Sequence, residues 1–229
     1  MNIVVFSANI GGYDDFRSPT TYDPNVRYIL YTDNKYYRSK VWEICHLDFL
    51  SKIKDKRRLA RYIKTNPHKV LPNHDINIWV DHCYTPKWQN TTEMLNSFDF
   101  NDKQIMNYKH DIRNCIYDES KVVIKDKLDY EYIVEKQMEL YREENFPEKL
   151  GLFDTGFTIR KNNKEVNKFN ETWWDTIEKN SARDQLSHVY SAWKNNITID
   201  TIPYGRSIYD NSFLNKKIKH PKKWLISYQ

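Results

Sequence analysis

Short, continuous apolar runs recur along the chain and are separated by polar turn residues. The first run, residues 2–8, empties into Asn9-Ile10-Gly11-Gly12-Tyr13-Asp14, and the second, residues 26–32, stops at Asp33-Asn34. Runs of this length bounded by turn residues predict buried strands. Further strands are expected at 75–81, at 104–108, at 152–160 with an interruption at Asp154-Thr155-Gly156, and at 197–202.

Apolar residues at helical spacing fill the segments between several of these strands. Asn66-Pro67 is expected to end the first helix, and Ser181 to cap the last. Strands that alternate with helices favour one mostly parallel central sheet flanked by helices on both faces. The predicted fold class is therefore α/β, as a single domain over residues 1–229. The expected helices are 55–65, 131–144, 165–178 and 182–194.

Length and composition are compatible with this fold. A chain of 229 residues can form one large domain, and aromatic residues, 15% of the total, supply apolar area for its core. The net charge of +5 suits a ligand that carries phosphate, and it equally suits an ordinary solvated surface. Nucleic acid is not expected as a partner, because zinc-finger spacing and basic heptad helices are absent from the sequence.

The cysteines and the apolar runs bear on where the protein works. Cys45, Cys83 and Cys115 lie far apart, which predicts neither a zinc cage nor a disulfide framework. The N-terminal run is too short for a signal peptide, and no run reaches the roughly 20 apolar residues of a membrane span. The expected location is the cytoplasm, or the host cytoplasm for a viral protein.

Candidate chemistry begins at Trp79-Val80-Asp81-His82-Cys83, where an apolar strand delivers a carboxylate to its end. Transfer of a sugar from a nucleotide diphosphate requires neutralisation of the leaving group, commonly by a divalent metal on carboxylates. Asp81 is placed for this work, although an Asp at a strand end is about as often a turn former. Cys83 stands where an Asp-x-Asp motif would have its second acid. His82 is a second candidate for metal or phosphate, with a structural role as its alternative.

Three further groups are candidates, each with a plain structural alternative. Arg61 and Lys64 share one face of the first helix with Arg57, and this face either contacts a diphosphate or is solvated. Asp184 begins the last helix, where it acts either as a structural acid or as a general base. His220 offers a metal or phosphate ligand from a basic C-terminal segment that otherwise reads as solvated.

Several common nucleotide and hydrolase motifs are missing from the sequence. It contains no Gly-x-x-x-x-Gly-Lys-Ser/Thr loop, no Gly-x-Gly-x-x-Gly turn and no Gly-x-Ser-x-Gly elbow. P-loop NTPases, Rossmann dehydrogenases and α/β-hydrolases are therefore disfavoured.

The series of segments resembles the mucilage- and turgor-related glycosyltransferase-like domain family, formerly a domain of unknown function. The resemblance includes Val4 to Asp14 with its two glycines, Ile78-Trp79-Val80-Asp81, and Arg183-Asp184-Gln185. Order and spacing are kept over nearly all the chain. The other matching segments are 31–34, 42–44, 60–64, 67–72, 110–119, 151–160, 173–174 and 186–187.

The resemblance implies a GT-A-like fold and transfer of a sugar from a nucleotide donor, with a UDP-sugar expected, to a glycan or glycoconjugate acceptor. It makes Asp184 the catalytic carboxylate and puts Asp81 in the place of the metal-binding carboxylate. His220, a candidate from the residues alone, would be a second ligand for Mn²⁺ or Mg²⁺, and the incomplete Asp-x-Asp leaves metal dependence open. The acceptor and sugar pocket is expected at His110, Arg113, Asp154, Thr155 and Gly156. The expected donor-binding residues are Ser7, Ala8, Asn9, Gly12, Tyr13, Asp33, Arg61, Lys64 and Asp81.

Two other functions stay open. Cys83 in place of an acid is compatible with a module that binds nucleotide-sugar or carbohydrate without catalysis. The charge of +5 is weak support for a phage-type DNA-modifying glycosyltransferase. Plant members of the family lie in the Golgi behind a membrane anchor. No membrane span is predicted here, so a viral or bacterial cytoplasmic enzyme is expected. Inversion at the sugar is slightly favoured over retention.

Overall fold

A computed structural model describes residues 1–46, 52–203, 205, 208, 210 and 212–215. Its centre is a seven-stranded sheet of described residues in the order β3-β2-β1-β4-β6-β5-β7. β1 pairs in parallel with β2 and with β4, and β2 pairs in parallel with β3. β6 is antiparallel to both of its neighbours, β4 and β5, whereas β7 is parallel to β5. The sheet is therefore mostly parallel, as predicted.

The strands are short, and the central ones are buried along most of their length. β4 is buried at all five positions, and β1 at six of seven, as expected for strands covered on both faces. The strands are β1 (Ile3–Asn9), β2 (Arg27–Thr32), β3 (Trp42–His46), β4 (Ile76–Val80), β5 (Ile105–Lys109), β6 (Phe153–Lys161) and β7 (Asp200–Thr201).

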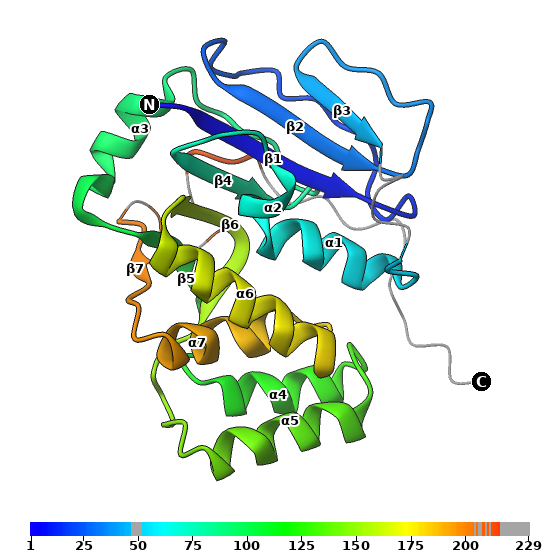
Figure 1. Cartoon of the computed structure of the whole chain (residues 1–229), viewed down its shortest axis with the longest axis vertical. Helices are drawn as coiled ribbons and strands as arrows, with labels where there is room; N and C mark the ends of the chain where they lie inside the picture. The colour runs from blue at the N-terminus through cyan, green and yellow to red at the C-terminus, as the bar shows by residue number, and fades with distance from the viewer. Residues whose placement is uncertain (47–51, 204, 206–207, 209, 211, 216–229) are drawn as a thin grey trace.

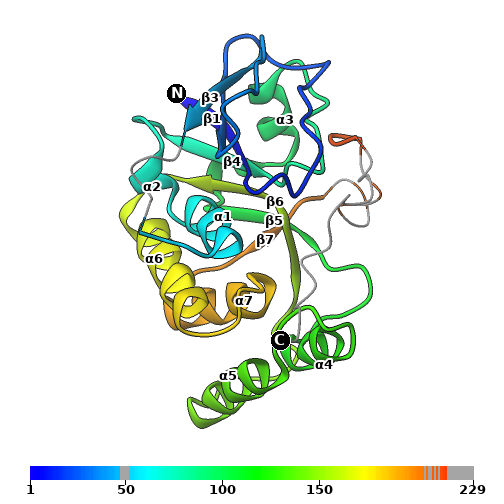
Figure 2. The same cartoon turned by 90° about the vertical axis from the view of Figure 1, so that its right-hand side faces the viewer.

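Helices cover both faces of the sheet (Figures 1 and 2). Seen in Figure 2, α3 lies on one face, and α1, α2 and α6 lie on the other, while α4 and α5 lie apart at one end of the molecule. The α-helices are α1 (Lys56–Thr65), α2 (Pro67–Val70), α3 (Thr91–Ser97), α4 (Ile116–Lys125), α5 (Glu131–Glu143), α6 (Lys164–Lys179) and α7 (Gln185–Lys194), and a 3-10 helix spans Phe100–Asp102.

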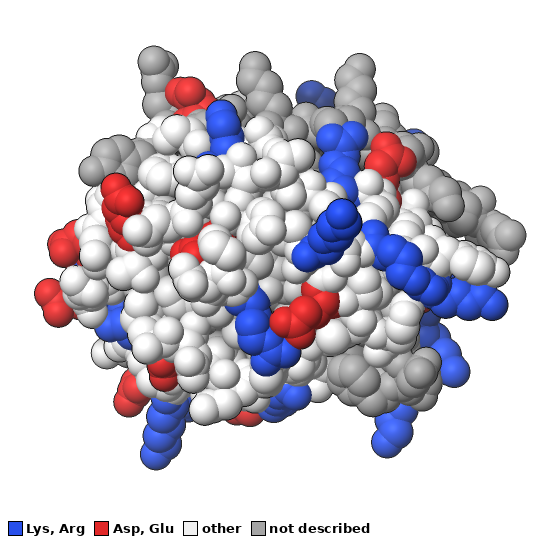
Figure 3. All heavy atoms as spheres, turned by 90° about the horizontal axis from the view of Figure 1, so that it is seen from above, with Lys and Arg blue, Asp and Glu red and all other residues white. Residues whose placement is uncertain are grey.

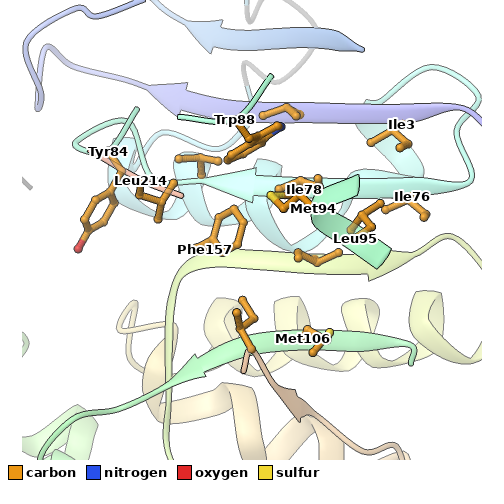
Figure 4. Close-up of a cluster of buried hydrophobic side chains, with 14 of the residues drawn as sticks. Ile3, Ile76, Ile78, Tyr84, Trp88, Met94, Leu95, Met106, Phe157 and Leu214 are labelled. Carbon is orange, nitrogen blue, oxygen red and sulfur yellow. The ribbon is translucent and has the colours of Figure 1, made fainter. Parts of the chain in front are cut away.

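The apolar core is divided by the sheet. On the α3 face, Met94 and Leu95 pack with Ile78 and Phe157, which point from β4 and β6 (Figure 4). On the other face, Leu59 and Ile63 of α1 pack on β1, β2 and Trp79. A third cluster joins α4, α5 and α7 and contains Val123, Val134 and Leu186. The helical end of the molecule thus has a core of its own.

The predicted elements are found, with three corrections at their ends. The last helix begins at Gln185 rather than at 182, because Ser181 bonds to Asp129 and Asp184 is the N-cap. The last strand has only two residues instead of six. β6 is continuous, but its pairing with β5 jumps from Tyr108–Asp154 to Asn107–Thr158, so the expected interruption is a bulge in the pairing.

Further expectations from the sequence concern membrane spans, the pairing of cysteines and the extent of the domain. Among the helices that the structure describes, none is long and apolar enough to cross a membrane. All three cysteines are free thiols. The prediction of one domain reaches residue 229 and therefore extends past the described ranges.

Candidate active site

A cavity of about 600 Å³ opens at the carboxyl ends of β1 and β4. Ligands of open α/β sheets commonly bind at this edge, where loops of several strands meet. The wall includes residues of the loop after β1, of α1, of β6 and of the start of α7, so four distant segments converge there. The predicted site residues among its lining are Ala8, Tyr13, Arg61, Asp81, Asp154, Thr155, Gly156 and Asp184.

Two carboxylates in this cavity share one buried lysine. Lys64 Nζ, on α1, lies 2.5 Å from Asp184 Oδ2 and 3.3 Å from Asp81 Oδ1. The lysine side chain is 1% exposed, the Asp184 side chain 6% and the Asp81 side chain 31%. Lys64 therefore lies beneath the carboxylates and is absent from the cavity lining, and Asp81 is the more accessible acid.

Other groups hold both carboxylates in place. Arg61 Nε lies 3.2 Å from Asp184 Oδ1, and Thr155 Oγ1 donates to Asp184 Oδ2 at 2.9 Å. The Trp79 indole donates to Asp81 Oδ1 at 2.6 Å. Within the described residues, Asp81 Oδ2 accepts no hydrogen bond. One carboxylate oxygen of the cluster is thus available to a ligand.

The cations decide the ionisation of both acids. Burial opposes the charge of Asp184, but Arg61 and Lys64 outweigh it and hold the pKa of Asp184 well below its ordinary value. The same balance of burial against Lys64 and Arg61 lowers the pKa of Asp81. Both carboxylates are therefore ionised at neutral pH.

The backbone beneath the cluster is fixed by a buried arginine. Arg160 of β6 donates to Lys64 O at 2.8 Å, to Asn170 Oδ1 at 2.7 Å and to Asn77 Oδ1 at 3.1 Å. These partners are neutral, and burial lowers the pKa of Arg160 to about 9. At neutral pH this arginine adds positive charge below Lys64.

Gly156 allows β6 to approach Asp81 closely. Its carbonyl accepts from Asp81 N at 2.8 Å. A Cβ atom at this position would lie 2.9 Å from Ile208 Cδ1 and 3.3 Å from Asp81 Oδ2. The absence of a side chain at Gly156 thus lets Asp81 lie directly against β6.

The predicted donor-binding loop after β1 is braced by its own side chains. Asp33 accepts from Gly11 N at 2.8 Å and pairs with Lys56 at 2.9 Å, while the Asn9 amide donates to Asp14 O at 2.8 Å. Gly11 and Gly12 have positive φ values of 71° and 61°, which favour glycine. Ser7, Asn9, Gly12 and Asp33 are absent from the cavity lining, which includes Ala8 of β1 and Tyr13 of the loop.

Two of the predicted acceptor residues lie outside this cavity. Arg113 Nε donates to the buried Glu119 at 2.6 Å, and His110 Nδ1 accepts from the backbone N of Arg113 at 3.1 Å. This local cluster holds the turn before α4. The structure brings Asp154, Thr155 and Gly156 to the cavity but leaves His110 and Arg113 among their own neighbours.

The lining also contains His82, a sequence candidate for metal or phosphate, and two residues without a predicted role, Arg183 and Gln185. His82 is buried, its Nε2 accepts from Arg17 N at 3.3 Å, and burial lowers its pKa to about 4. Gln185 donates from its amide to Phe153 O at 3.1 Å. The signal available in the sequence was adjacency: these residues flank Asp81 and Asp184.

A divalent metal was expected on Asp81 and His220. Among the described residues, no group of three or more His, Cys, Asp or Glu side chains could hold a metal ion. The group of this chain that suits such an ion is Asp81 Oδ2, which accepts no hydrogen bond from the described residues. It is a hard oxygen of the kind that Mg²⁺ and Mn²⁺ accept alongside substrate phosphates. His220 lies outside the described residues.

Comparison with protein families decides the relationship. Residues 1–203 match the family model for the TOD1/MUCI70 glycosyltransferase-like domain. This chain belongs to the TOD1/MUCI70 family. The sequence resemblance is therefore confirmed, and the matched region of this TOD1/MUCI70 domain contains the whole carboxylate–lysine cluster.

A solved structure supports the fold of this TOD1/MUCI70 domain. The apo structure of the bifunctional glycosyltransferase WbbM is similar with a TM-score of 0.51 at 10% sequence identity, over 88% of this chain. The match covers only 39% of the WbbM chain, and at this identity it is evidence for the glycosyltransferase fold alone. No protein among the curated sequences matches.

Proposed function

We propose that the protein is a glycosyltransferase that moves a sugar from a nucleotide-diphosphate donor, a UDP-sugar, to a glycan or glycoconjugate acceptor. The observation that carries the proposal is the convergence of Asp81 and Asp184 on Lys64 and Arg61 in one cavity at the carboxyl edge of the sheet. Family membership and the WbbM-like fold support the reaction class.

The proposed donor site follows the cavity from the loop after β1 to Asp81. Ala8 and Tyr13 would contact the nucleoside, and Arg61 would approach the diphosphate, whose charge increases as its bond to the sugar breaks. Asp81 Oδ2 would be the chain's ligand for a divalent ion beside the diphosphate, with His220 as a second ligand. Such an ion supplies neutralisation of the leaving group.

Asp184 is the proposed catalytic carboxylate, beside Thr155 and Gln185. It is ionised at neutral pH, as a general base must be, and it lines the cavity. Its low pKa makes proton uptake from the acceptor hydroxyl dependent on a weakening of the contacts to Arg61 and Lys64. Because the pKa of Asp184 lies well below its ordinary value, a fall in the transfer rate as the pH drops toward 6 would come from another group.

A nucleotide screen tests the proposal. The purified protein is heated with UDP-, GDP-, CMP- and dTDP-sugars, each with Mn²⁺ or with EDTA. A donor at a hundred times its dissociation constant adds about 2.7 kcal/mol, or roughly 5–10 °C in melting temperature. The expected result is a shift with UDP-sugars that Mn²⁺ enlarges, and slow release of UDP in the same samples.

Two other results favour the alternatives. Binding without any release of UDP or transfer to added acceptors supports a module without catalysis, an alternative that Cys83 in place of an acid and the cation-paired carboxylates favour. Binding of duplex DNA with an affinity that falls steeply as the salt concentration rises supports the DNA-modifying enzyme. Acidic and basic side chains are interspersed on the face shown in Figure 3, so that face offers no uniformly basic surface. A folded protein that binds no nucleotide sugar contradicts the proposal.

A further inference from the structure

Arg183 differs from the other cations that line the cavity. Lys56, Arg57 and Arg61 each pair with a carboxylate, at 2.9, 3.6 and 3.2 Å respectively. Within the described ranges, the Arg183 guanidinium has no hydrogen-bond or ion-pair partner, and its Nε is buried. A buried donor without a partner is uncommon, because it gives up its bonds to water and gains none.

Arg183 lies among other buried charges. Arg57, Arg61 and Lys64 pair with Asp81, Asp129 and Asp184, and the acids Asp14 and Asp154 also line the cavity. Burial is the main reason why the pKa of Arg57 falls to about 10, and repulsion by Arg183 contributes. The buried Arg160 beneath Lys64 has neutral partners. The group that an added anion would pair with is therefore the Arg183 guanidinium itself.

Arg183 lies toward the helical end of the cavity. Its backbone N donates to Ser181 Oγ at 3.1 Å, and that hydroxyl donates to Asp129 at 2.6 Å in the connection between α4 and α5. Leu128, from the same connection, lines the cavity and accepts from Arg57 at 2.8 Å. In Figure 1, α4 and α5 lie at the opposite end of the molecule from β1, β2 and β3.

The cavity therefore has two ends with different chemistry. The loop after β1 forms one end, which the proposed function assigns to the nucleoside, and Asp81 and Asp184 lie between the ends. Asp126 is exposed at the rim, where solvent screens its charge. The guanidinium of Arg183 offers a planar donor fork suited to the two oxygens of a carboxylate or phosphate.

We propose that Arg183 forms an oxyanion subsite for the acceptor, and that the acceptor sugar carries a carboxylate or phosphate group. This inference rests on the proposed function, because the nucleotide must occupy the other end of the cavity. It makes Arg183 a residue that determines acceptor specificity, distinct from the residues that hold the donor diphosphate.

The experiment uses the full chain saturated with UDP and Mn²⁺, so that the diphosphate site is filled. Methyl glucuronide and the neutral methyl glucoside are titrated by ligand-observed NMR, and inorganic phosphate is titrated by thermal shift. The variants are Arg183→Gln and the charge-preserving Arg183→Lys. Arg38→Gln is the matched control, because Arg38 is exposed and absent from the cavity lining.

The expected result is that wild type binds the glucuronide and phosphate, and that Arg183→Gln binds both about tenfold more weakly or worse, as the loss of a charge-assisted hydrogen bond predicts. Arg183→Lys should fall between the two, and Arg38→Gln should match wild type. UDP affinity should be unchanged in Arg183→Gln, which also demonstrates that the variant is folded.

Three results would overturn the inference. An equal loss of UDP affinity in Arg183→Gln would assign the residue to the donor diphosphate. Equal affinity for methyl glucuronide and methyl glucoside would argue against an oxyanion subsite. Failure of both phosphate and methyl glucuronide to bind the UDP-saturated protein would do the same. If wild type binds no UDP at all, the proposed function fails first, and that outcome is separate from these.

Discussion

Two clusters of buried charge in this protein have ion pairs of similar length but join different numbers of helices and strands. In the cavity, Lys64 lies 2.5 Å from Asp184, a residue 120 positions away in the sequence. Outside it, Arg113 lies 2.6 Å from Glu119, six positions away. The first cluster joins α1, β4, β6 and the start of α7 around a cavity, whereas the second holds a single turn.

The comparison separates structural charge from candidate chemistry. The local cluster can form whenever the turn before α4 forms. The cavity cluster forms only after several elements have packed, and it brings charges together in a buried place, which is costly unless each is paired. A paired but cavity-lining carboxylate such as Asp184 is therefore the stronger candidate for function than the acid of the local cluster.

Removal of Asp184 should give the largest effect. Asp184→Asn leaves Lys64 and Arg61 without their shared carboxylate, and the loss of one partner of a buried pair costs about 3–5 kcal/mol of unfolding free energy. Transfer of sugar should fall by about a hundredfold or more, as expected for loss of acid–base chemistry. Denaturant unfolding and UDP release measure the two effects.

The double variant Asp184→Asn/Lys64→Met separates stability from activity. Without the lysine charge, stability should recover in large part, while transfer should stay as low as in the single variant. A double variant that recovers both would contradict the catalytic role of Asp184.

His188 of α7 is buried against Phe169 and Trp173 and gives stability a dependence on pH. Burial, with the charges of Lys64 and Arg160, lowers the pKa of His188 to about 3, so it stays neutral in the folded state while the unfolded chain takes up a proton below pH 6.5. Stability should therefore fall as pH falls from 6.5 to 4.5, by about 2–3 kcal/mol from this residue. His188→Phe should flatten the slope of the unfolding free energy over that range.

His110 in the local cluster provides the matched control. Burial lowers its pKa as well, but Glu119 opposes the shift. His110→Gln should therefore change the slope less than His188→Phe. Equal slopes in wild type and His188→Phe would contradict the neutral, buried state of His188.

Gly156→Ala tests the close approach of β6 to Asp81. The added methyl would lie 2.9 Å from Ile208 Cδ1 and 3.2 Å from Tyr84 Cε2, so neighbouring groups must shift. We expect a loss of about 1–2 kcal/mol in stability together with weaker UDP binding, measured by calorimetry. Unchanged UDP affinity in this variant would argue that the nucleotide does not contact this wall.

The smallest effect is expected from Glu119→Gln in the local cluster. The amide keeps one acceptor for Arg113 and loses the charge, so stability should fall by about 1 kcal/mol. UDP affinity should be that of wild type.

The acceptor KM of Glu119→Gln tests the sequence prediction that His110 and Arg113 contact the acceptor. An increase in this KM over that of wild type would support the prediction.

Local patterns account for most of what the sequence could predict of the fold. Continuous apolar runs predicted β1, β2 and β4, because these strands are buried on both faces. β3 received no prediction, since Trp42 is its only buried position and its remaining residues are half-exposed or exposed. α4 was missed because its buried positions include Tyr117, Glu119 and Ser120, which do not form an apolar stripe.

The candidate site was less predictable from sequence. Asp81 and Asp184 were identified from the strand end and from family resemblance, but their shared contact with Lys64 depends on tertiary packing. Lys64 was expected to touch the ligand, yet burial places its ammonium behind the acids. That Arg183 has no carboxylate partner among the described residues is likewise visible only in the tertiary structure.

A crystal structure of the protein with UDP and Mn²⁺ would show whether the cavity binds the donor nucleotide. We expect UDP in the cavity, with its nucleoside against Ala8 and Tyr13, its diphosphate near Arg61 and the metal on Asp81. UDP bound elsewhere, for example against Arg113 and His110, would contradict this expectation.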